Sequence, residues 1–291
     1  MGLISSKIRN KFQKLSQRKI IPISESAEAR RISSEISRTV KTHDQLRGYD
    51  PVHATYILAQ NLASVFAEQL SALPEMKEYY DAVAHAEDIY MPQGPPISPL
   101  TGSYFTLWAF FDLSLGKDRE TVGTCFIELA DILKVHPEQQ RVLQLLQASR
   151  MGIFEHCGTK RKLIELKEIL TGKTHFCVCP AGYPGKRGEL WYARILPSPI
   201  ERLDYSVVMT TPYVLIGHAK SEWINFFQRH AVSETDPELE TTLHQFMKYG
   251  ESRYFWNEYI FEAYFNHRHD VIFLEGIPDL KETLPHADSD L

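Results

Sequence analysis

The sequence predicts an α+β protein in which an N-terminal helical region precedes a small, mostly antiparallel sheet with helices packed on it. Apolar residues recur at helical spacing through the first half of the chain. Segments that alternate with period two, or that are rich in β-branched and aromatic residues, appear after residue 173. Helices and strands that are segregated along the chain favour α+β over a parallel βαβ design.

Residues 1–20 are predicted to form a basic amphipathic helix, because apolar side chains recur at helical spacing and no residue among them is acidic. Such a helix can lie in the interface of an anionic membrane, with its apolar stripe toward the lipid and its basic residues on the head groups. The residues expected at that surface are Ile4, Lys7, Ile8, Arg9, Lys11, Phe12, Lys14 and Leu15. One alternative is a solvated helix that orders only when something binds it. Another is an arm that binds nucleic acid, which the acidic remainder of the chain disfavours.

The first residues, MGLISS, also fit the pattern for N-myristoylation, with Gly2 as the acceptor. One acyl chain together with a polybasic helix gives the two signals that anchor a protein stably. Residues 21–48 are polar and rich in Ser, Glu and Arg, so they are predicted to form a linker. Residues 49–291 are expected to form one compact domain, with a helical region over 49–172 and a sheet-plus-helix region over 173–291.

The helical region is predicted from apolar periodicity and from its breakers. The expected helices cover residues 52–73, 74–90, 104–111, 119–135, 137–149 and 160–171. Four prolines and two glycines in the segment 91–103 exclude regular structure and predict a rigid loop. Thr101 or Ser103 is expected to cap the aromatic helix that follows this loop.

The sheet region is predicted from four strand-like segments at residues 174–180, 190–196, 205–216 and 271–278. Pro212 should kink the third segment or place it on a sheet edge. Residues 181–189 are glycine-rich and are expected to form a hairpin turn between two strands. Helices are expected at residues 220–231, 237–249 and 251–266, the last with an aromatic face against the sheet.

Composition limits the classes of function. The net charge of -5 argues against a whole-chain nucleic-acid binder, which needs a broad basic face. No apolar run reaches the roughly 18 residues that span a bilayer, and no apolar core of a secretory signal lies near the start. Four cysteines are too few for a disulfide framework in a chain of this length. These features predict a cytoplasmic protein, peripheral to a membrane if residues 1–20 bind one.

His175, Cys177 and Cys179 form the first candidate site. On a strand these three residues share one face, and imidazole and thiolate are the ligands that zinc prefers. His156 and Cys157 lie about twenty residues upstream and would be further ligands. However, zinc cysteines are usually spaced as C-x2-C. The alternative is that small cysteines pack in the core of the sheet.

Glu258, Glu262, His267, His269 and Asp270 form the second candidate site. The two glutamates are one helical turn apart, and the two histidines follow the expected helix end. Carboxylates and imidazoles in one cleft suit general acid–base or metal-assisted hydrolysis. The alternative is a helix C-terminus with solvated histidines.

Two hypotheses about function follow. The first is a non-catalytic binding or scaffold protein that recognises an unknown protein partner and reaches an anionic membrane through residues 1–20. The second is a hydrolytic or metal-dependent enzyme with its site in the C-terminal half. The sequence contains no phosphate-binding loop, no G-x-S-x-G elbow and no H-E-x-x-H motif, which favours the first.

Overall fold

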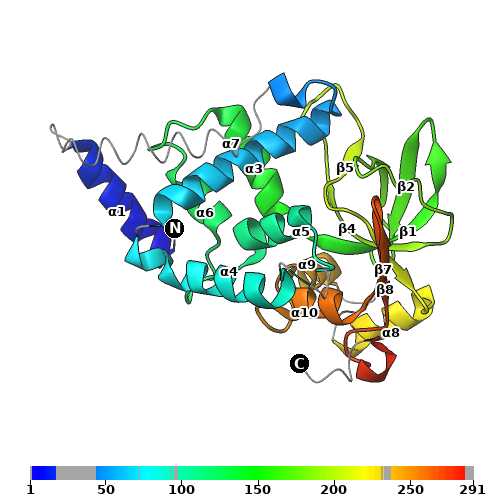
Figure 1. The fold of residues 1–291 in the computed structure, drawn as a ribbon. Coiled ribbons are helices and arrows are strands. Elements are labelled where there is room, and N and C mark those ends of the chain that lie inside the picture. Colours follow the sequence, from blue (N-terminus) through cyan, green and yellow to red (C-terminus); the bar gives the residue numbers. More distant parts are fainter. Residues whose placement is uncertain are drawn as a thin grey trace. The chain divides into compact units, whose positions relative to one another are not determined.

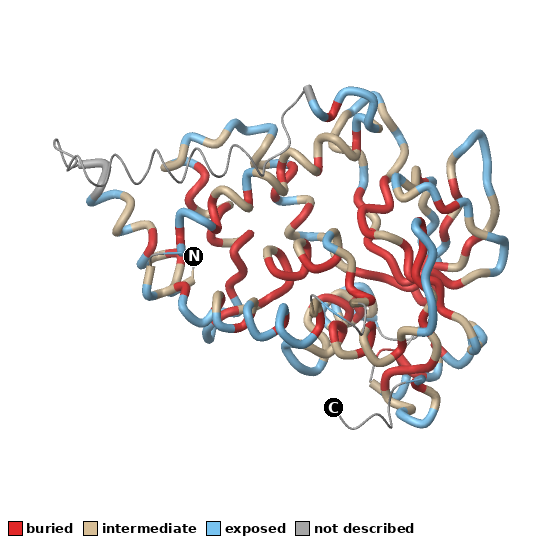
Figure 2. Tube along the Cα trace, viewed as in Figure 1, coloured by how far each residue is buried: buried red, intermediate tan, exposed pale blue. Residues whose placement is uncertain are grey.

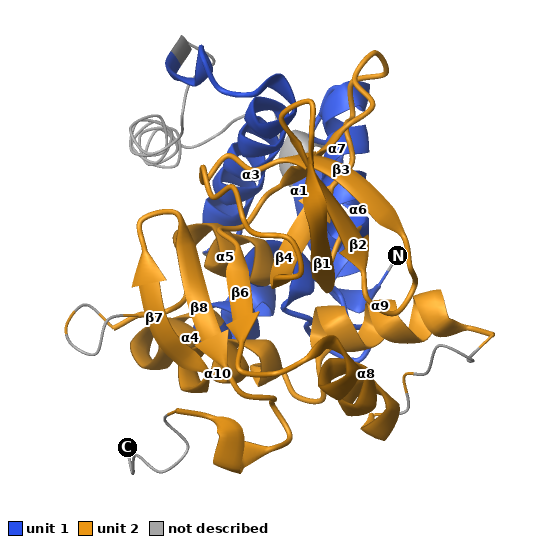
Figure 3. Ribbon diagram, turned by 90° about the vertical axis from the view of Figure 1, so that its right-hand side faces the viewer, with its two compact units in different colours: residues 1–82, 109–148 blue, residues 83–108, 149–291 orange. Residues whose placement is uncertain are grey.

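The computed structural model describes residues 2–17, 44–71, 73–92, 94, 98–230, 232 and 237–285. Within this part of the chain it confirms the α+β class: helices come first, and a mixed β-barrel with extra strands and C-terminal helices follows (Figure 1). The chain divides into two compact units, residues 1–82 with 109–148 and residues 83–108 with 149–291 (Figure 3). Most of the predicted linker, residues 21–43, lies outside the described residues.

Unit 1 is helical. Its elements are α1 (Leu3–Gln17), η1 (Asp44–Leu46), α3 (Pro51–Leu70), η2 (Pro74–Met76), the first part of α4 (Lys77–Tyr90), α6 (Val122–Leu129) and α7 (Pro137–Ala148). Asp50 caps α3 by accepting a hydrogen bond from the His53 N–H at 3.0 Å, and Pro51 fills the first turn. Phe66 and Phe126 stack at 4.4 Å between α3 and α6.

The helices of unit 2 include the predicted aromatic one. They are the end of α4, α5 (Gly102–Leu107), α8 (Lys220–Arg229), α9 (Leu239–Tyr249), α10 (Phe255–Glu262) and the short η4 (Lys281–Thr283). Thr101 is the N-cap of α5 and accepts a hydrogen bond from the Tyr104 N–H at 3.3 Å, as the sequence predicts. A π-helical turn, η3 (Trp108–Asp112), continues α5.

In the described part of the chain, eight strands form one sheet. They are β1 (Met151–Lys160), β2 (Leu163–Glu168), β3 (Thr174–Val178), β4 (Leu190–Leu196), β5 (Ser206–Val208), β6 (Tyr213–Ile216), β7 (Tyr264–Arg268) and β8 (Val271–Glu275). Their order is β1-β2-β3-β5-β4-β6-β8-β7, and β1 also pairs with β4. That extra pairing closes β1, β2, β3, β5 and β4 into a five-stranded barrel. The pairs β3–β5 and β6–β8 are parallel and the others are antiparallel, so the sheet is mostly antiparallel as predicted.

The predicted strand at 205–216 is divided in two at Pro212. Its first part, β5, pairs with the end of β4 inside the barrel, where Ile195 lies opposite Val208. Its second part, β6, pairs with the start of β4, where Leu190 lies opposite Leu215. The kink that proline imposes therefore turns the chain from the barrel into the sheet extension.

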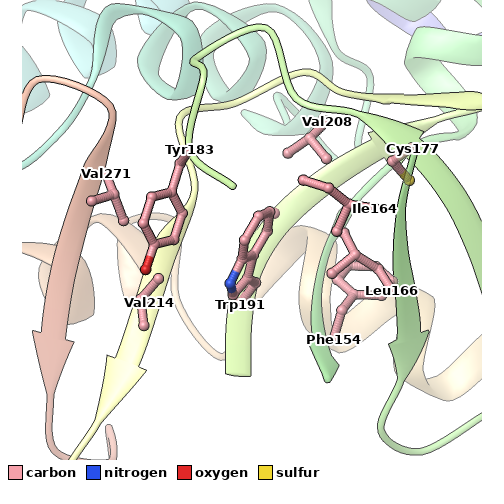
Figure 4. Close-up of a cluster of buried hydrophobic side chains, with 10 residues drawn as sticks. Phe154, Ile164, Leu166, Cys177, Tyr183, Trp191, Val208, Val214 and Val271 are labelled. Carbon is pink, nitrogen blue, oxygen red and sulfur yellow. The ribbon is translucent and has the colours of Figure 1, made fainter. Parts of the chain in front are cut away.

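A cluster of buried apolar side chains fills the barrel from alternate residues of its strands and continues onto β6, β8 and the loop before β4 (Figure 4). Phe154, Leu166, Cys177 and Trp191 are among its members, each at most 4 % exposed. Figure 2 shows the chain around this core as buried, whereas the tip of the β1–β2 hairpin is exposed. On β4, the neighbouring residue Tyr192 contacts Trp256 of α10 at 5.3 Å between ring centroids, so α10 covers that part of the sheet.

Three sequence predictions are wrong. Residues 160–171 do not form a helix, because β2 pairs with both β1 and β3 and its residues alternate between the core and solvent. The helix expected up to residue 266 ends at Glu262, and Phe265 lies exposed on β7. The turn at 181–189 is not a hairpin, since it joins β3 to β4, which are not neighbours. In each case strand pairing across the sheet overrides the local pattern.

Candidate functional site

The β1–β2 hairpin ends in three consecutive basic residues. Lys160 pairs with Leu163, so the two-residue turn is formed by Arg161 and Lys162. Both have left-handed backbones, with φ of 51° and 69°. A two-residue turn of this kind strongly favours Asn-Gly, because side chains with a Cβ are strained there. This chain places two long cations where the turn itself favours small residues.

The three cations are exposed, and two carboxylates of the neighbouring strand segments have other partners. Glu155 pairs with Lys220 at 2.9 Å, and Glu168 pairs with Arg150 at 2.7 Å. Among the described residues, no ion pair or hydrogen bond engages the side chains of the three basic residues 160–162. Their charge is therefore directed toward solvent.

An exposed aromatic ring lies beside these cations. Phe176 projects outward from β3 and is 37 % exposed, while its neighbour Cys177 points into the core. The Lys160 ammonium is 6.0 Å from the centre of the Phe176 ring. Glu165 lies opposite Phe176 on β2 and is half-buried. We call the outward-facing set Lys160, Arg161, Lys162, Lys167 and Phe176 the basic hairpin face.

The loop 179–189 lies next to the hairpin and is held by one carboxylate. Glu189 accepts hydrogen bonds from the Tyr183 hydroxyl at 3.0 Å and from the Trp191 indole at 3.3 Å. The hydroxyl donates to this carboxylate, and together with burial, which is the larger cause, this raises the Tyr183 pKa to about 12. The loop thereby fixes the exposed Lys186 and Arg187. Burial raises the pKa of the Cys157 thiol on β1, and the positive charges of Lys167 and Arg187 partly offset that rise.

Two further contacts fix the shape of this loop. His156 is buried and its Nε2 lies 3.1 Å from the Pro184 carbonyl. Because a carbonyl only accepts, Nε2 carries the proton. Gly185 has φ of 68°, and a Cβ there would lie 2.4 Å from the Trp191 ring. Only glycine fits at this position.

The predicted zinc residues do not assemble a site. Cys177 is buried in the barrel core, and burial raises its pKa. Burial also raises the pKa of Cys179 to about 11 and lowers that of His175. Among the described residues, no three His, Cys, Asp or Glu side chains are placed to hold a metal ion. The thiols are therefore protonated and pack as apolar groups.

The predicted catalytic residues fall into two groups. Glu258 and Glu262 of α10 share one partner, with the Lys281 ammonium 3.5 Å and 2.6 Å away. His267 lies on β7, where its Nδ1 is 2.6 Å from the Tyr264 hydroxyl. His269 is exposed in the β7–β8 turn.

Asp270, the last member of that set, is buried beside the Arg268 guanidinium, with 3.6 Å between Nε and the carboxylate. Arg268 also lies over the Tyr183 ring at 5.2 Å. The charge of Asp270 contributes to raising the Cys179 pKa, which links a predicted catalytic residue to a predicted zinc ligand. The hydrolytic hypothesis gains no assembled acid–base pair from these placements.

The predicted membrane helix is docked in unit 1. Ile8 is fully buried, and Ile4 and Phe12 are partly buried, while Leu15 has no described side chain. Arg9 pairs with Asp131 at 3.0 Å, and Lys11 pairs with Glu75 at 2.6 Å. Lys7 and Lys14 are exposed.

The docking of this helix also explains why a glycine stands at position 2. A Cβ at Gly2 would lie 2.2 Å from the Glu120 carboxyl carbon. Membrane binding and acylation of residues 1–20 remain predictions.

A second polar cluster, which sequence reasoning missed, surrounds Ser149. The buried Arg194 donates to the Ser149 hydroxyl at 3.2 Å, and the buried Lys248 donates to the Ser149 carbonyl at 2.9 Å. Burial, followed by the charges of Lys248, Arg150 and Arg194, lowers the pKa of His244 to about 4. These residues lie on β4, on α9 and before β1, so no local motif marks them.

No protein-family model, curated protein or solved structure matches this chain. Within the described residues, no helix is both long and apolar enough to cross a membrane. The candidate site therefore depends on the geometry of the hairpin itself. In the sequence its signal is the tetrapeptide Thr159–Lys162, which a helical interpretation of residues 160–171 hides.

Proposed function

We propose that this is a non-catalytic binding protein that takes an anionic partner at the basic hairpin face. The observation that carries the proposal is the pair Arg161 and Lys162 in the left-handed region of a two-residue turn. Backbone strain of this kind costs about 1–3 kcal/mol per residue and persists where it serves a function. Two exposed cations that form no ion pair with any described residue are a reason to retain it.

The topology of the barrel adds support. The order β1-β2-β3-β5-β4-β1, with β3 parallel to β5, is that of oligonucleotide- and oligosaccharide-binding barrels. In those barrels the face of strands 2 and 3 and the loop between strands 1 and 2 contact the ligand. The basic hairpin face occupies the same two elements. The likeness is one of topology, which by itself assigns no ligand.

The test uses a variant that is expected to fold better than the wild type. Arg161→Asn with Lys162→Gly supplies the favoured turn and removes two charges. We expect its free energy of unfolding in urea to rise by about 1–2 kcal/mol. We also expect it to elute from heparin, a generic polyanion, at lower salt than the wild type.

The matched control is Arg119→Asn with Lys134→Gly. These two cations also have positive φ, 49° and 54°, but lie in unit 1. The control relieves the same kind of strain and removes the same charge, so its elution should stay close to that of the wild type. The proposal is wrong if the hairpin variant and the wild type elute together, or if both variants lose retention equally.

A further inference from the structure

We infer that the anionic partner of the basic hairpin face is a single-stranded nucleic acid, with Phe176 as the platform for one base. This inference rests on the proposed function and names its ligand. It requires three things at one place: an exposed flat ring, cations within reach of a strand that passes over the ring, and a rigid support. Each of the three is present on described residues.

The ring has the position that stacking requires. Phe176 projects from the side of a barrel strand, held between the buried Cys177 and the half-buried His175. Its cross-strand neighbour on the outward face is Glu165. With that neighbour in place, Phe176 is still 37 % exposed. Aromatic stacking on bases tolerates any sequence, because every base has a π-face.

The cations are placed for phosphates that flank a stacked base. Lys160 lies 6.0 Å from the ring centre, and Arg161 and Lys162 follow it at the tip. Lys167 lies on the same outward face of β2, one strand from the ring. A strand that stacks a base on Phe176 would meet positive charge on the hairpin side.

Charge and position also separate this ligand from a lipid surface. A surface that binds lipid buries apolar side chains at the acyl boundary, whereas here the residues that project farthest, Arg161 and Lys162, are charged and the Phe176 ring lies lower on the strand. Duplex bases are already stacked on each other and are not available to Phe176. The net charge of -5 averages over both units, so it excludes a broad basic face but not this local one.

The experiment measures binding of the full chain to a fluorescent oligothymidylate of about 12 nucleotides by anisotropy. Phe176→Ala should raise the Kd by about 5- to 150-fold, the range expected for loss of one stacked base. Phe176→Trp should retain the affinity, and its fluorescence should be quenched on binding. The matched control is Phe265→Ala, which removes an exposed phenylalanine from β7.

Salt dependence provides a second readout that unfolding does not imitate. If the three tip cations each contact one phosphate, log K should fall against log salt with a slope of roughly -2. In the Arg161→Asn/Lys162→Gly variant Lys160 is the one tip cation that remains, so the part of the slope that the tip contributes should fall to roughly -0.7.

Two competitors separate the possible failures. If inorganic polyphosphate binds through Arg161 and Lys162 but the oligonucleotide binds no better and Phe176→Ala has no effect, the ligand inference fails and the proposed function stands. If phosphatidylserine vesicles bind through the hairpin in preference to both, the ligand inference is also wrong. If none of the probes binds, both proposals fail together.

Discussion

The Glu120 carboxylate is predicted to hold helix α1 in place. It accepts hydrogen bonds from the N–H groups of Ile4 and Ser5, at 2.7 and 2.9 Å, and from the Ser5 hydroxyl at 2.5 Å. Glu120 is thus the charged cap of a helix that has no acidic residue of its own in the first turn. The perturbation is Glu120→Ala.

The magnitude follows from the groups that lose their partner. Loss of a capping side chain costs about 1 kcal/mol. Leaving the buried Ser5 N–H unpaired adds about 1–3 kcal/mol, whereas the Ser5 hydroxyl keeps the Gly2 carbonyl, 3.2 Å away, as an acceptor. We therefore expect docking of α1 to weaken by about 2–4 kcal/mol, or about 30- to 1,000-fold. The backbone pairing of Glu120 with Leu115 does not involve the side chain and should remain.

The assay is amide hydrogen exchange of residues 4–12, which reports local opening of α1. The control is Asp118→Ala: this exposed carboxylate accepts one hydrogen bond, from the Leu3 N–H at 2.8 Å, and its loss should change protection little. Unchanged protection in Glu120→Ala, or equal loss of protection in both variants, would show that the Glu120 carboxylate does not hold α1. Release of α1 should also increase binding to anionic vesicles if the membrane prediction for residues 1–20 is correct.

The remaining predictions concern Gly2, the loop before β4 and one histidine. Gly2→Ala should loosen α1 in the wild type, because the added Cβ would clash with the Glu120 carboxylate. In the Glu120→Ala background that carboxylate is absent, so the effect should be much smaller; equal effects in a double-mutant cycle would contradict this. Gly185→Ala should lower the urea midpoint more than Gly182→Ala, since both have positive φ but only Gly185 also meets a side chain within 4 Å. His244 has a pKa of about 4 when folded and 6.5 when unfolded, so the unfolded state binds more protons between these values. Stability should therefore be full above pH 6.5 and fall toward pH 4, and His244→Gln should flatten the slope of unfolding free energy against pH.

Helices with strong local signals were predicted well from the sequence. The helices expected from residues 52 and 74 begin at Pro51 (α3) and at Pro74 (η2, which α4 continues), and Thr101 caps α5 as expected. The β2 strand was missed because Leu163, Leu166 and Leu170 also recur at helical spacing. Pairing with β1 and β3 selects the period of two that a strand has over the helical spacing, and this pairing is not encoded within the segment itself.

The candidate site was missed for the same reason. Three basic residues at the start of a predicted helix are an ordinary solvated face, whereas at the tip of a two-residue hairpin their charge is concentrated and the backbone of Arg161 and Lys162 is strained. The residues chosen from the sequence were selected by their chemistry: Cys177 is suited to zinc in type but lies in the core. Residue type alone does not say which face of a strand points inward.

Local patterns, namely periodicity, prolines and caps within a few residues, account for the α+β class, most helices and the strand segments that contain β3, β4, β5, β6 and β8. The groups that contact the charged segments are set by tertiary packing, because they come from distant parts of the chain. The basic stretch at the start of the chain carries no acidic residue, yet Asp118 and Glu120 supply the negative charge at the start of α1 from more than one hundred residues away. Barrel closure likewise decides that Phe176 faces outward beside Lys160 while Cys177 faces inward, since that depends on pairing between strands rather than on either segment.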